Sequence, residues 1–249
     1  MWFATNGGVS RYDGISFRNY TTKEGLINNR LTKVFESNSG DIWITTLFGL
    51  SRIEFDQFKD KYIIQNIDKK AGLVSNAVFC ISQVNDSIVW VGTARGINKL
   101  LIKEAKDPYY KREAKVIESI DNTKGLLSNS VNDLLVDNNG DVWLSYIGSG
   151  VSRYDVVDQK FHHFGIKEGL SSNTINDLFL DEDGNVWCAS GNGVNVIVPN
   201  QIGEYKIYNT THIPELKDLN VRAVVQDFNG DILLGANQLF KLHIKDHFL

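Results

Sequence analysis

The stretch from Asp137 to Tyr154 reads DNNGDVWLSYIGSGVSRY, which is typical of short strands joined by tight turns. Its Asn-Gly pair indicates a hairpin turn, because glycine adopts a positive φ without a steric clash. A strand that carries Trp143 follows the turn, and a Gly-rich loop then leads into another strand. The same phrase returns along the whole chain, so we expect the protein to be built from copies of one small β unit.

The spacing of the tryptophans indicates where the copies lie. Consecutive tryptophans are 41 to 53 residues apart, and Leu233 takes the equivalent place in the last copy. In four copies the motif Gly-Leu-x-x-Asn begins 18 residues before the tryptophan. We interpret each indole as a large apolar plate between adjacent sheets, which buries on the order of 200 Å². The tryptophans to which we give this structural role are Trp2, Trp43, Trp90, Trp143 and Trp187.

Each complete copy reads as four short strands. No stretch has a convincing helical period, and 21 glycines punctuate the strands. Four strands in a unit of roughly 40 to 50 residues indicate a β-propeller. A sheet of this kind is apolar on both faces, so neighbouring sheets have to stack face to face to form a core. The predicted fold class is therefore all-β, a propeller of four-stranded blades.

The same motifs predict the blade boundaries, and they assign residues 1–249 to a single propeller region. The N-terminal and the C-terminal segments each supply the two middle strands of a blade, so together they do not make up one complete blade. We therefore expect an incomplete arc of five to six blades cut from a larger propeller. The alternative is six blades closed on themselves, with two three-stranded sheets among them. The expected blades are 1–24 (partial), 25–70, 71–123, 124–167, 168–212 and 213–249 (partial).

Composition argues against several classes of protein. The net charge is −4, and no basic stripe suggests a nucleic-acid partner. No apolar run of about 18 residues predicts a membrane span, and the N-terminus does not read as a signal peptide. Cys80 and Cys188 lie in apolar strand-like runs, so we expect buried free thiols and no disulfide framework.

The sequence offers no catalytic constellation, and we predict no enzyme, no cofactor and no metal site. Residues 181–185, DEDGN, superficially resemble a calcium loop, but they lack its ligand spacing and stand where other copies have a turn. No spacing of His and Cys suits zinc, and no Gly-x-Ser-x-Gly elbow or phosphate-binding loop occurs. We therefore interpret 181–185 as a turn.

A binding surface can be predicted from strand direction. Strands alternate, so the loops between the second and third strands and the loops between blades lie on one rim. These loops differ in chemistry from copy to copy, which suggests recognition, whereas the hairpins on the opposite rim are alike. Aromatic, Asn and Arg side chains suit a sugar, and a solvated loop edge is the alternative at each position. The candidate ligand-binding residues are Arg30, Phe48, Arg95, Tyr146, Asn192, Arg222 and Asn237.

The succession Gly-Leu-x-x-Asn, Gly-x-x-Trp, Gly-[Leu/Val]-x-x-Tyr-[Asp/Asn] and Phe-x-x-[Tyr/Phe] resembles the two-component regulator propeller repeat. The copies that match best are 125–164 and 169–187, with GGVSRYDGISFRNY at 7–20. The copy at 71–123 departs most, since Asn-Asp-Ser at 85–87 replaces the turn glycine and an insertion lengthens 103–115.

The resemblance implies a function that composition does not. Members of this family are the periplasmic sensor regions of hybrid two-component system histidine kinases of Bacteroidetes, and many recognise oligosaccharides. It implies a ligand-sensing propeller in the periplasm that binds an oligosaccharide, homodimerises in the full-length protein and signals to a kinase outside this chain through a phosphorelay. The alternatives are a protein-interaction scaffold with no small-molecule ligand and, less expected, a propeller lyase or hydrolase.

Overall fold

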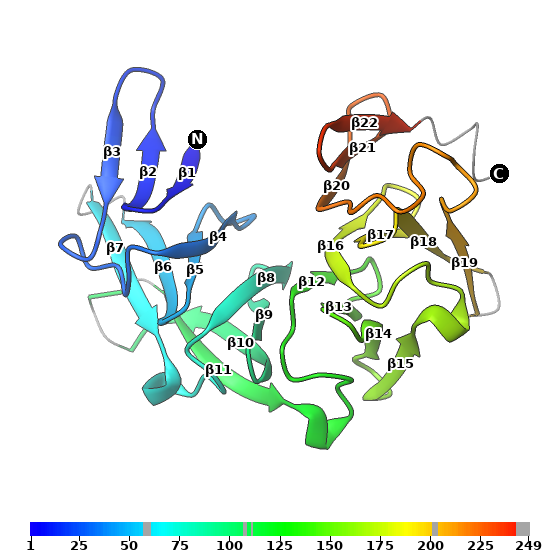
Figure 1. The fold of residues 1–249 in the computed structure, drawn as a ribbon. Coiled ribbons are helices and arrows are strands. Elements are labelled where there is room, and N and C mark those ends of the chain that lie inside the picture. The colour runs from blue at the N-terminus through cyan, green and yellow to red at the C-terminus, as the bar shows by residue number, and fades with distance from the viewer. Residues whose placement is uncertain (57–60, 107–108, 111, 201–203, 243–249) are drawn as a thin grey trace. The chain divides into compact units, whose positions relative to one another are not determined.

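A computed structural model describes residues 1–56, 61–106, 109–110, 112–200 and 204–242. This part of the chain forms 22 strands, all in antiparallel sheets, and three short 3-10 helices (Figure 1). The chain divides into two compact units, Met1–Val131 and Asn132–Leu249, and we describe each by itself. Residues 243–249 of the expected last blade lie outside the described residues.

The sheets are numbered blade 1 to blade 6 in chain order, and the first unit contains blades 1 to 3. Blade 1 consists of β1 (Trp2–Thr5), β2 (Gly8–Tyr12) and β3 (Phe17–Tyr20). Blade 2 consists of β4 (Leu31–Glu36), β5 (Ile42–Thr46), β6 (Gly49–Asp56) and β7 (Lys61–Ile67). Blade 3 consists of β8 (Val78–Asn85), β9 (Ile88–Thr93), β10 (Gly96–Glu104) and β11 (Arg112–Ile120).

The second unit contains blades 4 to 6. Blade 4 consists of β12 (Asp133–Val136), β13 (Val142–Tyr146), β14 (Gly150–Asp155) and β15 (Lys160–Phe164). Blade 5 consists of β16 (Ile175–Leu180), β17 (Val186–Ser190), β18 (Val194–Pro199) and β19 (Tyr205–Asn209). Blade 6 consists of β20 (Ala223–Gln226), β21 (Ile232–Gly235) and β22 (Leu239–Leu242).

In every blade each strand pairs with the next strand along the chain. The predicted fold class, an all-β propeller of four-stranded blades, is confirmed. The first and last blades have three strands each in the described residues, as expected for an incomplete propeller. The two cysteines are free and buried, which confirms that prediction as well.

The core lies between neighbouring blades. Residues of blades 1 and 2 form one apolar cluster, and residues of blades 2 and 3 form another around Trp43. In the second unit the cluster between blades 4 and 5 contains Trp143, and the one between blades 5 and 6 contains Trp187. These three indoles and that of Trp90 are at most 2% exposed, whereas Trp2 is only half-buried.

The motif Gly-Leu-x-x-Asn has a structural role in the loop between blades. In the loop that precedes blade 3, the 3-10 helix η1 (Lys69–Ala71) ends at Gly72, whose φ of 108° favours glycine. Leu73 is buried, and the side chain of Asn76 accepts a hydrogen bond from the Lys69 amide at 2.8 Å. The same geometry recurs with the other two 3-10 helices, η2 (Asn122–Lys124) and η3 (Ile166–Glu168). The motif therefore fixes the shape of each loop at the rim.

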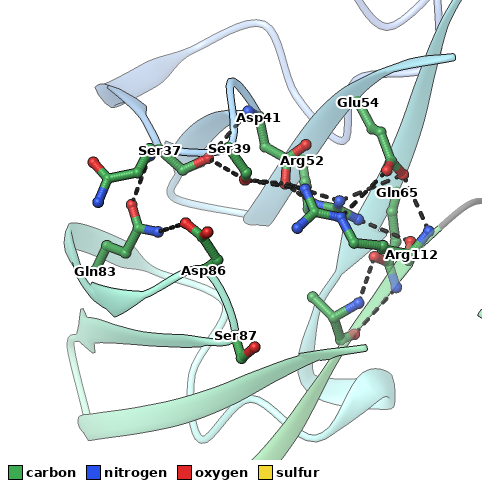
Figure 2. Close-up of polar contacts among 12 residues, drawn as sticks. Ser37, Ser39, Asp41, Arg52, Glu54, Gln65, Gln83, Asp86, Ser87 and Arg112 are labelled. Carbon is green, nitrogen blue, oxygen red and sulfur yellow. Dashed lines mark hydrogen bonds and ion pairs between the residues drawn. The ribbon is translucent and has the colours of Figure 1, made fainter. Parts of the chain in front are cut away.

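A buried ion-pair network joins blades 2 and 3 (Figure 2). Arg52 is 1% exposed, and its Nη2 lies 2.9 Å from Asp41 Oδ2. Arg112, at the start of β11, places its Nη2 2.7 Å from the same oxygen. Glu54 lies 3.4 Å from Arg52 and 3.5 Å from Arg112. Arg112, which lies within the lengthened segment 103–115, thus fastens the outer strand of blade 3 to the neighbouring blade.

Candidate ligand-binding rim

In several blades the turn between the second and third strands is braced by a side-chain hydroxyl. In blade 3 the Thr93 hydroxyl donates to the Gly96 carbonyl at 2.7 Å and accepts from the Arg95 amide at 3.1 Å. Thr46 in blade 2 and Ser190 in blade 5 make the same two bonds. In these three blades the backbone of the turn is therefore held by the turn's own side-chain hydroxyl, and the side chain at the tip varies.

Blade 2 brings two of the sequence-predicted site residues to the same end of its sheet. Leu31 pairs with Thr46, so Arg30, one residue before Leu31, and Phe48, two residues after Thr46, lie beyond the same end of the sheet. Phe48 is 54% exposed, Leu47 beside it is 47% exposed, and Arg30 is exposed. The residues that carry an aromatic ring, an aliphatic side chain and a guanidinium thus lie at the same end of this blade.

Blades 3 and 6 carry the other exposed candidates. Arg95 is exposed at the tip of its turn. In blade 6 the Arg222 amide donates a hydrogen bond to the Gly235 carbonyl at 2.8 Å. Arg222 therefore lies at the same end of the sheet as the turn that contains Asn237. Both side chains are exposed.

Asn192 has a different role, because its side-chain amide is engaged on both sides. Its Nδ2 donates to the Ser171 carbonyl at 3.3 Å, and its Oδ1 accepts from the Asp218 amide at 2.8 Å. Asn192 therefore joins the loop that precedes blade 5 to the loop that follows it. A ligand could use this amide only by breaking those bonds.

Tyr146 is a correction to the sequence prediction. The sequence predicts a rim loop at Tyr146, but this residue is the last of β13 and is fully buried. A ligand on the rim does not reach its ring. The next residue, Ile147, is 60% exposed and occupies the tip instead. Ile147 and Leu47 belong to the predicted rim loops, but they are not among the candidates because the choice favoured polar and aromatic side chains.

The described cavities lie away from these rim residues. One of about 610 Å³ is lined by residues of blades 1 and 2, among them Trp2, Arg11 and Tyr62. Another of about 530 Å³ lies against β15 and β19, and a third of about 420 Å³ lies at the hairpins of blades 5 and 6. None of the candidate residues lines any of these three cavities.

The acidic turn at 181–185 is held by its own hydrogen bonds. Asp181 Oδ1 accepts the amides of Asp183 and Asn185, and its Oδ2 accepts Trp187 Nε1 at 2.7 Å. Within the described ranges, no three His, Cys, Asp or Glu residues are grouped to hold a metal ion. In the same residues no helix has the length and apolar character needed to cross a bilayer.

Two copies of the repeat match a known family model. Residues 125–148 and 169–192 match the model described as "Two component regulator propeller". They begin at the glycines of the Gly-Leu-x-x-Asn motifs in the two copies that carry the resemblance best. The resemblance is therefore confirmed for these copies. No curated protein sequence is similar enough to the chain to count as a relative.

Several solved structures share the fold. The extracellular domain of a protein described as the hybrid two component system BT3049 from B. thetaiotaomicron is 23% identical, with a TM-score of 0.74 over 98% of this chain and 33% of that one. The corresponding domain of BT4673 from the same organism is 21% identical, with a TM-score of 0.77 over 99% of this chain and 33% of that one.

An enzyme also shares the fold. A catalytically inactive virginiamycin B lyase from Staphylococcus aureus is 11% identical, with a TM-score of 0.64 over 98% of this chain and 79% of that one. At such identities the likeness shows a common propeller fold. The chain spans about a third of the length of the two extracellular domains.

Proposed function

We propose that the chain is the ligand-sensing propeller of an extracytoplasmic sensor in a two-component system, and that it is not an enzyme. The observation that carries this proposal is the match of two copies to the two-component regulator propeller model. The fold shared with extracellular domains of such systems agrees with a periplasmic location. In this proposal residues 1–249 act as one propeller region.

The ligand we propose is an oligosaccharide bound on the rim. Phe48 offers an exposed aromatic face at the end of blade 2, and Arg30 ends the same sheet beside it. A sugar ring has an apolar face that packs on an aromatic plate and hydroxyls that accept hydrogen bonds from a guanidinium. Arg95, Arg222 and Asn237 would extend this surface along other blades, each within its own unit.

Signalling would follow from a change in the dimer of the full-length protein. The ligand shifts the equilibrium between two arrangements only by its difference in affinity for them. The rigid turns suit this task, because a ligand that contacts several blades meets a fixed frame. The output would be a kinase carried by residues outside this chain.

Calorimetric titration of the folded chain, and of any longer ectodomain that contains it, against a panel of oligosaccharides tests the proposal. Phe48→Ala should weaken binding about 5- to 30-fold, since a stacked aromatic is worth about 1–2 kcal/mol with its buried area. Phe228→Ala is the matched control, because Phe228 is fully exposed on the hairpin of blade 6. Failure of every glycan to bind a folded ectodomain would refute the sugar ligand.

A protein-interaction scaffold is the second candidate, and a specific observation favours it. Leu47 and Ile147 are exposed in their turns and Leu239 is exposed at the start of β22, where a purely sugar-binding surface would have no use for aliphatic side chains. This alternative predicts a partner protein whose binding is lost in Ile147→Asp, with no response to any glycan. Affinity purification with the wild-type chain and this variant separates the two candidates.

A further inference from the structure

The outer strands of blades 2 and 3 are joined by one side chain on the last strand of blade 2. Gln65 Nε2 donates a hydrogen bond to the Ala114 carbonyl at 3.1 Å, and its Oε1 accepts one from the Ala114 amide at 2.9 Å (Figure 2). Strand pairing sets Gln65 opposite Arg52. The two hydrogen bonds therefore fasten β7 to β11 near the outer edge of these blades.

The boundary between blades 4 and 5 has different residues at the equivalent positions. His162 is opposite Arg153, so it takes the place of Gln65. Tyr205 takes the place of Ala114, because a Cβ on the loop glycine of each blade would meet the residue two positions further along the outer strand. A phenol ring thus stands where blade 3 has a methyl group. Within the described ranges, the side chain of His162 forms no hydrogen bond that would fasten the two strands.

A cavity of about 530 Å³ lies against these two strands, β15 and β19. Part of its wall is apolar, with Phe164 from β15 and Tyr205 and Ile207 from β19. Phe164 is only 8% exposed, and its ring centroid lies 5.4 Å from that of Tyr205. The aromatic wall is therefore held in place by packing between the blades.

Two carboxylates line the polar side of this cavity, and its described lining contains no lysine or arginine. Glu168 Oε2 accepts the Gly165 amide at 2.7 Å, and the other oxygen of Glu168 forms no hydrogen bond within the described ranges. Glu204 Oε2 has a long contact, at 3.5 Å, with Asn200 Nδ2. In the part of the chain that the structure describes, neither carboxylate has a cationic side chain within ion-pair distance.

The arginine beside the cavity does not supply the missing positive charge. The Arg153 guanidinium lies over the Tyr205 ring at 5.5 Å, but it forms ion pairs with Asp141 and Asp155. Its position shows that the Tyr205 ring attracts a cation. The charge of the two glutamates is left for a ligand to neutralise.

We propose that this cavity binds a small organic cation, an amine carried on a short apolar body. The charged group pairs with Glu204 and with the free oxygen of Glu168, and the apolar body packs on Phe164 and Tyr205. The site lies on the outer strands of blades 4 and 5 and not at the turns that carry the proposed sugar site. It therefore goes beyond the proposed function.

Charge and ligand chemistry favour an organic cation over the other small occupants. An anion would be repelled by the two carboxylates. In the described residues no three His, Cys, Asp or Glu side chains are grouped to hold a metal ion. A neutral polyol could donate hydrogen bonds to the carboxylates, but it would leave their charge without a partner.

Cadaverine, an aliphatic diamine, is the probe, and 1,5-pentanediol is its neutral counterpart of the same length. In calorimetric titrations of the chain at pH 8 and low salt, we expect saturable binding of cadaverine, at least about 10-fold tighter than that of the diol. Glu204→Lys reverses one charge of the lining and should weaken cadaverine binding at least about 10-fold. Glu215→Lys makes the same change in net charge at an exposed residue outside the lining, and it should bind normally.

A second measurement uses the wild-type chain and so does not depend on the folding of a variant. His162 and His163 also line the cavity, whereas His212 does not. Cadaverine should therefore shift the imidazole proton signals of the first two and leave that of His212 in place. The proposal is overturned if the diol binds as tightly as cadaverine, which would indicate a polyol site. It is also overturned if Glu204→Lys binds normally, if the shifts spare His162 and His163, or if nothing binds at 10 mM.

Discussion

A single residue at the start of the hairpin, Asp137, holds blade 4 in two ways. Asp137 Oδ1 accepts the amides of Asn139 and Asp141, which closes the turn, while its other oxygen accepts the indole of Trp143. In blade 2 this position is Ser37, whose hydroxyl still accepts the amide of Asp41 at 3.0 Å. Nε1 of Trp43 is then buried without an acceptor in the described residues. The carboxylate therefore adds the indole contact to a turn that serine can also close.

We predict that Asp137→Ala lowers the free energy of unfolding by about 1–3 kcal/mol, because a partly buried indole N–H loses its acceptor and the turn loses its cap. Asp137→Asn should cost less, since an amide oxygen can still accept one of these bonds. Urea denaturation followed by tryptophan fluorescence measures both. Asp158→Ala, on an exposed turn, is the control. Equal losses in Asp137→Ala and the control would contradict the assignment.

At the scale of elements, the sequence could predict strands but not every contact between them. The regular spacing of Trp43, Trp90 and Trp143 is a local signal that each blade repeats, and the strands follow from it. The contact of Arg112 with Asp41 joins residues 71 positions apart, and it arises from an insertion that no other copy has. The repeating pattern of the sequence gives no sign of such a contact. Tyr146 was misplaced for a related reason, because the end of a strand is set by pairing and not by residue type.

The ion-pair network between blades 2 and 3 gives a second prediction. Asp41→Ala should destabilise the chain by about 3–5 kcal/mol, since it leaves Arg52 buried without its main partner. Arg112→Ala should cost less, because the Arg112 side chain is 24% exposed and water can replace part of what is lost. Lys115→Ala, which removes a half-exposed pair with Glu113, should change stability by less than about 1 kcal/mol. Thermal unfolding that ranked these variants in another order would refute the network as a clamp.

A comparison of two glycines, Gly96 and Gly140, gives a third prediction, and Gly140 serves as the control. Gly96 has a φ of 121°, and a Cβ there would lie 2.2 Å from the Ile120 carbonyl oxygen. Gly140 has a φ of 85°, but a Cβ there would meet nothing within 4 Å. Gly140→Ala should therefore cost about 1–2 kcal/mol from backbone strain alone, whereas Gly96→Ala must also move a strand and should cost clearly more. Equal midpoints in urea for the two variants would show that the close approach is not a constraint.

At the scale of the whole molecule, titratable groups in both units make the fold weaker in acid. Hydrogen bonds to backbone amides lower the pKa of Asp13 in blade 1 and of Asp155 in blade 4. The hydrogen bond from Thr123 lowers the pKa of Asp121. Because these pKa values are lower in the folded state, the carboxylates contribute stability above their unfolded pKa of about 4 and lose it as the pH falls through the folded values.

Protonation linked to His163 should cause a separate loss of folding stability, at a higher pH than the loss caused by the carboxylates. Burial lowers its pKa below 6.5, and the neighbouring His162 acts in the same direction. The unfolded chain therefore takes up a proton on this ring first, so stability should begin to fall as the pH drops below about 6.5 and level off below the folded pKa. The Ser152 hydroxyl, 2.9 Å from His163 Nδ1, suits the neutral ring. Melting temperatures between pH 8 and pH 3 should show both losses in the wild-type chain, and only the acidic one in His163→Gln. If the two profiles coincide between pH 7 and pH 5, the ring does not titrate as proposed, and the acid weakening belongs to the carboxylates alone.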